Sequence, residues 1–132
     1  MSTFNAIGVA STGVTVYRKW LDAVSDNVAN MNTVTRTSEN AFQQRYVIAQ
    51  EASDGNGVQV GGAAFGSAEG RLVHDPNNPL ADAEGYVRMP DIDLGSQMGQ
   101  LVMAQRGYQA NLSVVERAKD SYNAAIQLGK GS

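Results

Sequence analysis

The segment FNAIGVASTGVTVYRKWLDAVSDNVANM, residues 4–31, carries a regular spacing of apolar side chains. These side chains recur at alternating intervals of three and four residues, which places them on one face of a helix. The set, here called the N-terminal stripe, is Ile7, Ala10, Val14, Tyr17, Leu21, Val24, Val28 and Met31. We therefore expect a long amphipathic helix at this end of the chain.

Residues 92–128, at the other end, show a second stripe with the same alternation. This C-terminal stripe has polar interruptions at Gln105 and Lys119, and it comprises Leu94, Met98, Leu101, Gln105, Tyr108, Leu112, Val115, Lys119, Tyr122 and Ile126. Pro90 ends the segment before it, and Asp91 or Asp93 is expected to cap the new helix.

Two apolar faces of this length need a cover, and the short region between them is too small to provide it. The helices are therefore expected to pack on each other, on neighbouring subunits, or on both. We predict helix-packing roles for Ile7, Val14, Tyr17, Leu21, Val24, Val28, Met98, Leu101, Leu112, Val115, Tyr122 and Ile126.

Between the helices the pattern changes to short runs of strand-forming residues separated by turn residues. Strands are predicted at residues 42–51, 57–65, 71–74 and 86–89, after a polar linker at residues 33–40. The predicted fold is α+β, mostly α, with long N- and C-terminal helices forming a coiled-coil-like pair and a small β-rich middle region. We divide the chain into an N-terminal helix with its motif (1–34), a linker and small β region (35–90) and a C-terminal helix (91–132).

The charge distribution bears on the partners of the chain. The net charge of −3 arises wholly within residues 35–90, whereas residues 1–34 and 91–132 each sum to zero. Neutral ends pack against like copies without accumulating repulsion. No basic stripe is present to bind nucleic acid, and no apolar run approaches the roughly 20 residues of a membrane span.

The residues offer little for catalysis or ligand binding. There is no cysteine for a disulfide or a thiolate metal site. His74 beside Asp75 has no serine or threonine nearby in the sequence with which to form a catalytic site. Residues 75–84 lack the spacing of an EF-hand calcium site. The glycines of residues 55–66 do not begin a helix, as the glycines of a phosphate-binding loop would. We expect no enzyme activity, no cofactor and no metal. Trp20 is either an anchor at a subunit contact or a partly buried structural tryptophan.

The motif Ser25-Asp26-Asn27-Val28-Ala29-Asn30-Met31-Asn32-Thr33 resembles the S-x-N-x-A-N-x-x-T signature of the flagellar rod and hook proteins, the axial proteins of the bacterial flagellum. Further along, the chain is similar to the proximal-rod, FlgC-like members of that family. These positions are His74-Asp75-Pro76, Gly85-Tyr86-Val87-Arg88-Met89-Pro90, Met98, Arg106, Tyr108, Ala110 and Asn111. The chain departs from the family at Gly107, where alanine is frequent, and at Gln97, where glutamate is common.

This resemblance implies a structural subunit of the basal-body rod that polymerises through its terminal helices into the axial drive shaft around the export channel. The implied partners are other rod subunits, copies of itself, the inner-membrane ring or export-gate adaptor at the rod base, and the type III export apparatus. The implied location is the periplasmic rod, reached without a cleaved signal peptide. The implied assembly motif comprises Ser25, Asn27, Ala29, Asn30, Asn32, Thr33, Arg106, Tyr108, Ala110 and Asn111.

An alternative remains: a small helical-hairpin adaptor that binds a soluble partner as a stable monomer. A rod subunit, in contrast, is expected to have poorly ordered helical ends before assembly.

The asparagines of the motif have a physical interpretation. Asn27 and Asn30 lie near the predicted end of the first helix, where backbone carbonyls lack partners. Asparagine donates to such carbonyls and tolerates the left-handed conformation that ends a helix. We hypothesise that Ser25, Asn27, Asn30 and Asn32 fix this helix end and the contacts between subunits.

Overall fold

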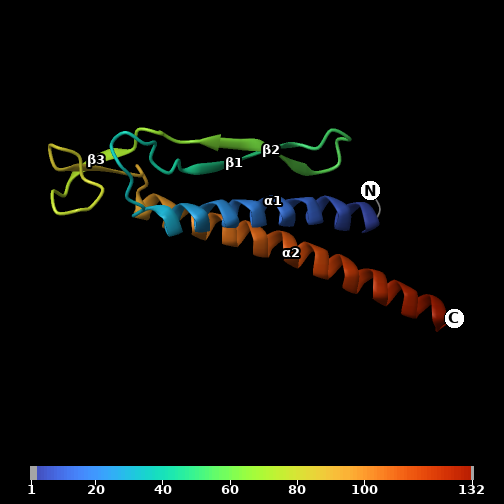
Figure 1. The fold of residues 1–132 in the computed structure, drawn as a ribbon. Coiled ribbons are helices and arrows are strands. Elements are labelled where there is room, and N and C mark those ends of the chain that lie inside the picture. The colour runs from blue at the N-terminus through green and yellow to red at the C-terminus, as the bar shows by residue number, and fades with distance from the viewer. Residues whose placement is uncertain (1–2, 132) are drawn as a thin grey trace.

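The computed structural model describes residues 3–131 of the 132-residue chain, with side chains from Asn5 onward (Figure 1). Two long helices, α1 (Thr3–Asn30) and α2 (Leu94–Lys130), flank four short strands in the sequence. The strands are β1 (Arg45–Glu51), β2 (Val58–Phe65), β3 (Arg71–His74) and β4 (Tyr86–Met89). The α+β, mostly α class is confirmed, and both helices begin and end within two residues of the predicted bounds.

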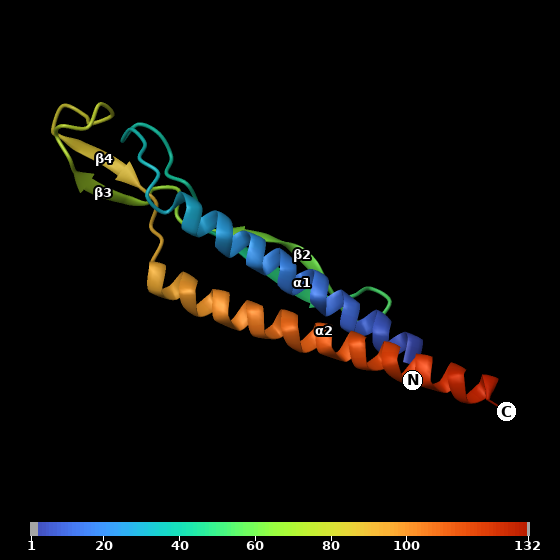
Figure 2. The ribbon, with the colours of Figure 1, turned by 90° about the horizontal axis from the view of Figure 1, so that it is seen from below.

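Helices α1 and α2 lie side by side and antiparallel, and α2 continues past the start of α1 (Figures 1 and 2). Asp93 is the N-cap of α2, since its carboxylate accepts a hydrogen bond from the Ser96 N–H at 2.7 Å. Glycines lie at two close contacts: a Cβ on Gly13 would be 2.6 Å from Asn111 Oδ1, and one on Gly107 would overlap the Tyr17 ring. These glycines weaken each helix but allow the two to approach closely.

Strands β1 and β2 form an antiparallel hairpin along the side of α1 that faces away from α2 (Figure 1). The register shifts between Ile48 and Ala49, which pair with Gly62 and Val60, so Gly61 is the extra residue of a bulge in β2. Near the far end of the hairpin, Thr12 Oγ1 on α1 accepts a hydrogen bond from the Val58 N–H at 3.1 Å. The structure therefore has three layers: hairpin, α1 and α2.

Strands β3 and β4 form a second antiparallel hairpin at the opposite end of the molecule from the two termini (Figure 2). Thr35 pairs with Arg88, and each N–H donates to the other's carbonyl at 2.9 Å. The segment predicted as a linker, residues 33–40, thus contains one isolated bridge, from Thr35 to β4, that its polar composition did not indicate. The Arg88 guanidinium of β4 also donates hydrogen bonds to the carbonyls of Thr37 and Glu69, which attach both of these loop residues to β4.

A carboxylate organises the turn before β4. Asp82 Oδ1 accepts hydrogen bonds from the Tyr86 and Glu84 N–H groups at 2.9 and 3.0 Å, and Oδ2 accepts one from Thr37 Oγ1 at 3.1 Å. These bonds, chiefly the one from Tyr86, together outweigh the opposing effect of burial and hold the pKa of Asp82 below its ordinary value of 3.8.

This arrangement predicts an acid-sensitive turn. Because the folded pKa of Asp82 is depressed, its stabilising effect is complete above pH 3.8 and is lost as the pH falls through the folded value. We expect the Tyr86 amide NMR signal to titrate with a midpoint below 3.8 and to lose that titration in Asp82→Asn. A midpoint at or above 3.8 would contradict the assignment.

Candidate assembly site

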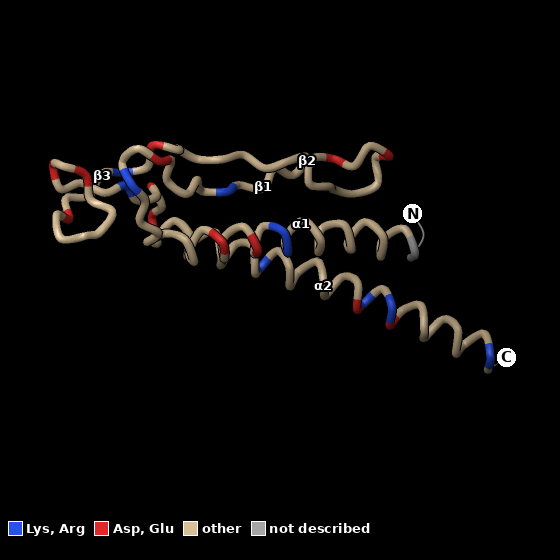
Figure 3. The backbone as a smooth tube through the Cα atoms, viewed as in Figure 1, with Lys and Arg blue, Asp and Glu red and all other residues tan. Residues whose placement is uncertain are grey.

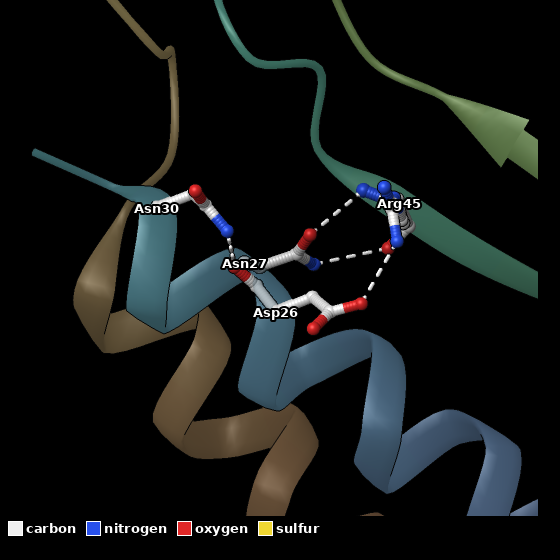
Figure 4. Close-up of polar contacts among 4 residues, drawn as sticks. All are labelled: Asp26, Asn27, Asn30 and Arg45. Carbon is white, nitrogen blue, oxygen red and sulfur yellow. Dashed lines mark hydrogen bonds and ion pairs between the residues drawn. The ribbon is translucent and has the colours of Figure 1, made fainter. Parts of the chain in front are cut away.

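Asn27 joins three elements of the fold. Its side chain is completely buried. Asn27 Oδ1 accepts a hydrogen bond from the Arg45 N–H at 2.8 Å, and Nδ2 donates to the Arg45 carbonyl at 3.0 Å (Figure 4). The amide thus pairs with the first residue of β1 much as a neighbouring strand would.

The same amide reaches α2. Asn27 Nδ2 also donates to Gln97 Oε1 at 3.0 Å, and Gln97 is itself completely buried. Gln97 Nε2 has no hydrogen-bond partner among the described residues. A buried polar pair between two helices disfavours every register in which its members part. Asn27 and Gln97 therefore set the alignment of α1 with α2.

Asn30 has a different role from Asn27. Its Nδ2 donates to the Asp26 carbonyl at 2.9 Å, one turn back (Figure 4). Its Oδ1 accepts a bond from Thr33 Oγ1 at 3.4 Å. Asn30 thus donates to a carbonyl near the end of α1, whereas both bonds that Asn27 donates go to groups outside α1, so the expected donation to helix-end carbonyls is wrong for Asn27. The left-handed ending is also wrong, since no described residue other than glycine has a positive φ.

The ion pair beside this site is weak. Arg45 Nη1 lies 2.8 Å from Asp26 Oδ2, but both side chains are about half exposed, at 47% and 51%. Water and salt screen such a pair, so it contributes at most about 1 kcal/mol. The buried amide of Asn27 therefore attaches β1 to the helices more strongly than this ion pair does.

The other motif residues of α1 face outward. Ser25 and Ala29 are exposed and line a groove of about 300 Å³ together with Val24, Val28, Met98 and Leu101. Asn32 and Thr33 are exposed just after the helix ends. The motif therefore has an inward residue, Asn27, and an outward pair of small residues one turn apart.

The motif residues of α2 are also divided. Asn111 is half-buried, donates to the Gly107 carbonyl at 2.9 Å and lies against Gly13 of α1. Tyr108 is half-buried, whereas Arg106 and Ala110 are exposed. The structure brings Asn111 to the helix interface and leaves Arg106 and Ala110 on the surface.

The predicted helix-packing residues differ in burial. Val24 is buried, and Met98, Tyr122 and Ile126 are exposed. Between these extremes are Ile7, Val14, Tyr17, Leu21, Val28, Leu101, Leu112 and Val115, which are half-buried. Their contribution to contacts between subunits stays a prediction.

Sequence reasoning missed the second apolar face of α1, which is directed at the hairpin. A cavity of about 430 Å³ separates Val9, Val16 and Trp20 from Val47 and Val58. The signal was present as another helical series, Val9, Val16, Trp20, Ala23 and Asn27, beside the N-terminal stripe. Within it, Trp20 Nε1 donates to Gln100 Oε1 at 3.2 Å, and the Trp20 ring stacks on Tyr17 at 6.0 Å.

Residues 3–131 contain neither a cluster of metal-ligating side chains nor a membrane-spanning helix. Within this part of the chain, no group of three or more histidine, aspartate and glutamate side chains is placed to hold a metal ion. None of the helices described is long and apolar enough to cross a membrane.

Comparison with known proteins connects this architecture to one family. Residues 83–128 match the model of the flagellar basal body rod FlgEFG protein C-terminal family. The flagellar basal-body rod protein FlgC of Yersinia enterocolitica is 34% identical over 98% of this chain and 100% of its own length. The FlgC proteins of Salmonella typhimurium and Bacillus subtilis are 33% and 30% identical, with the same coverage. The chain belongs to the FlgC family of flagellar basal-body rod proteins.

Proposed function

We propose that the chain is a structural subunit of the proximal rod that polymerises through its terminal helices into the tubular axial drive shaft around the export channel. The uncovered part of the C-terminal stripe carries this proposal. Met98 is 40% exposed, Ile126 is 37% exposed and Leu128, beside the stripe, is 78% exposed. Apolar surface of this extent on a helix favours association with other helices, which would cover it.

The partners follow from this role. The subunit would contact copies of itself and other rod subunits, and at the rod base the inner-membrane ring or export-gate adaptor. It would reach the periplasmic rod through the type III export apparatus without a cleaved signal peptide, and it would act in motility as a self-assembling structural protein rather than as an enzyme. The neutral helical segments support packing among like subunits.

The test is to replace Ile126 by lysine in cells that depend on this chain for swimming. Ile126 is already part-exposed, so we expect the unfolding free energy of the purified chain to change by no more than about 0.5 kcal/mol. In an assembled rod, the lysine at position 126 would place a charge in an apolar contact between subunits. We therefore expect the cells to lose motility and their purified basal bodies to lack rods.

Glu116→Lys is the matched control, because Glu116 is an exposed charged residue on the same helix. It should leave swimming intact. Normal rods in the Ile126→Lys strain, or a chain absent from wild-type basal bodies, would count against the rod function and favour a monomeric adaptor.

A further inference from the structure

The end of α2 projects beyond α1. The contacts of Asn27 with Gln97 and of Tyr17 with Gly107 set an antiparallel register that places Thr3, the start of α1, level with Ser121. We refer to residues 121–130 as the α2 extension. Figures 1 and 2 both show this end of α2 continuing past the start of α1.

The α2 extension carries no charge except at its last residue, Lys130. No acidic or basic residue lies between Asp120 and Lys130, as the uniform tan of this segment shows in Figure 3. All of its side chains are exposed, including Ile126 of the C-terminal stripe and Leu128. Exposed apolar side chains such as Ile126 and Leu128, on a stretch of helix without charges around them, are expected to pack on another apolar surface.

A matching surface lies near the opposite end of the helix pair. It is the groove of about 300 Å³ lined by Val24, Ser25, Val28, Ala29, Met98 and Leu101, here called the α1–α2 groove. None of these residues is charged. The small side chains of Ser25 and Ala29, four residues apart on one helix, leave room for another helix to approach closely.

Charges near the two surfaces are complementary. Asp22 and Asp26 on α1 and Asp91 and Asp93 before α2 lie close in sequence to the α1–α2 groove. Arg45 pairs with Asp26, and the carboxylates of Asp22, Asp91 and Asp93 have no ion pair among the described residues. The one charged residue of the α2 extension is Lys130. Opposite charges at two otherwise uncharged surfaces favour the docking of one on the other.

We infer that the α2 extension of one copy packs into the α1–α2 groove of the next copy, head to tail. This inference rests on the proposed function. Val24, Val28, Met98 and Leu101 of the groove belong to the two apolar stripes, and Ile126 of the extension continues one of them, so the contact prolongs the same helix interface from copy to copy. Complementary surfaces at opposite ends of an elongated subunit form a heterologous contact that propagates instead of closing.

The hairpin cavity is a less suitable acceptor. Although it is larger, at about 430 Å³, it lies mainly between α1 and the β1–β2 hairpin: Val47, Ala49 and Val58 of the strands line it, and Asn111 is the one described residue of α2 that does. A helix entering there would lie between two layers of the same subunit and would not continue the α1–α2 interface. The experiment below distinguishes the two acceptors.

Disulfide cross-linking tests the contact, because the chain has no cysteine of its own. Ala29→Cys combined with Leu128→Cys would replace the natural chain in swimming cells, and purified basal bodies would be oxidised and resolved without reductant. In one molecule these positions are separated by roughly 50 Å of helix, so a bond joins two copies. We expect a ladder of bands at multiples of 14.0 kDa.

Three controls accompany the cross-linking pair. Each single cysteine variant should give no band above a dimer, and Val47→Cys with Leu128→Cys, which probes the hairpin cavity, should give no ladder. Adding Lys130→Glu to the Ala29–Leu128 pair should lower the cross-linked fraction several-fold, whereas Lys130→Arg should not.

The inference is overturned if the chain is present in basal bodies but the Ala29–Leu128 pair gives no ladder, or if only the Val47–Leu128 pair does. Absence of the natural chain from basal bodies would instead overturn the proposed function, so the two failures are distinguishable.

Discussion

Asn27→Ala is expected to lower the free energy of unfolding by about 2–4 kcal/mol. The substitution removes both hydrogen bonds to the Arg45 backbone and leaves buried Gln97 Oε1 without its donor. Each buried group that loses its partner costs about 1–3 kcal/mol, and partial access of water at exposed Arg45 moderates the total. Urea unfolding followed by circular dichroism measures the difference.

Asn30→Ala is the matched control from the same motif. Asn30 loses only exposed hydrogen bonds, to the Asp26 carbonyl and Thr33, so we expect a cost below about 1 kcal/mol. Asn27→Asp provides a second check, because the carboxylate keeps the acceptor for the Arg45 N–H but faces two other acceptors, the Arg45 carbonyl and Gln97 Oε1. Equal costs for Asn27→Ala and Asn30→Ala would refute the three-element role of Asn27.

Gly70→Ala is expected to destabilise the β3–β4 hairpin by about 3–5 kcal/mol. Gly70 has a φ of +58°, and a Cβ there would lie 2.7 Å from Ala41 Cβ and overlap the Met89 carbonyl oxygen. The carbonyl belongs to a paired strand and cannot rotate away as a flexible side chain would. Amide exchange at buried Val87 of β4, together with urea unfolding, would report the loss.

Gly55→Ala separates backbone strain from steric overlap. Gly55 also has a positive φ, +74°, but a Cβ there would meet only the end of the Glu51 side chain, at 4.0 Å. We expect a cost of about 1–2 kcal/mol from the conformation alone. If the two alanine variants were equally stable, the overlap with Met89 would have no energetic consequence and the expectation for Gly70 would be wrong.

The regular elements were predictable because their signals are local. The alternation of three and four residues defines both helices, and Asp93 caps α2 as its position after Pro90 suggested. The strands at residues 71–74 and 86–89 have the predicted bounds, since turn residues delimit them. Strand β1 was predicted to begin at residue 42, but it begins at Arg45. Arg45 is the residue whose backbone pairs with the Asn27 amide.

The site was less predictable because its contacts are non-local. Nothing near Asn27 in the sequence indicates that its amide would bind the backbone of Arg45 and the side chain of Gln97. Gln97 itself falls outside the C-terminal stripe, and a glutamine without apolar spacing gives no sign of complete burial. The hairpin-facing side of α1 was overlooked because the N-terminal stripe already explained α1 as a helix with a single apolar face, so a second apolar face was not sought.

The central bonds of this molecule also govern when it can fold. Asn27 and Gln97 are 70 positions apart, and Trp20 and Gln100 are 80 apart, so neither pair can meet until nearly all of the polypeptide is available. Closing such long loops costs entropy before any burial compensates for it, which slows folding. A nascent chain emerging from the ribosome would therefore remain unfolded until synthesis is almost complete, because α1 cannot pack before α2 has been made.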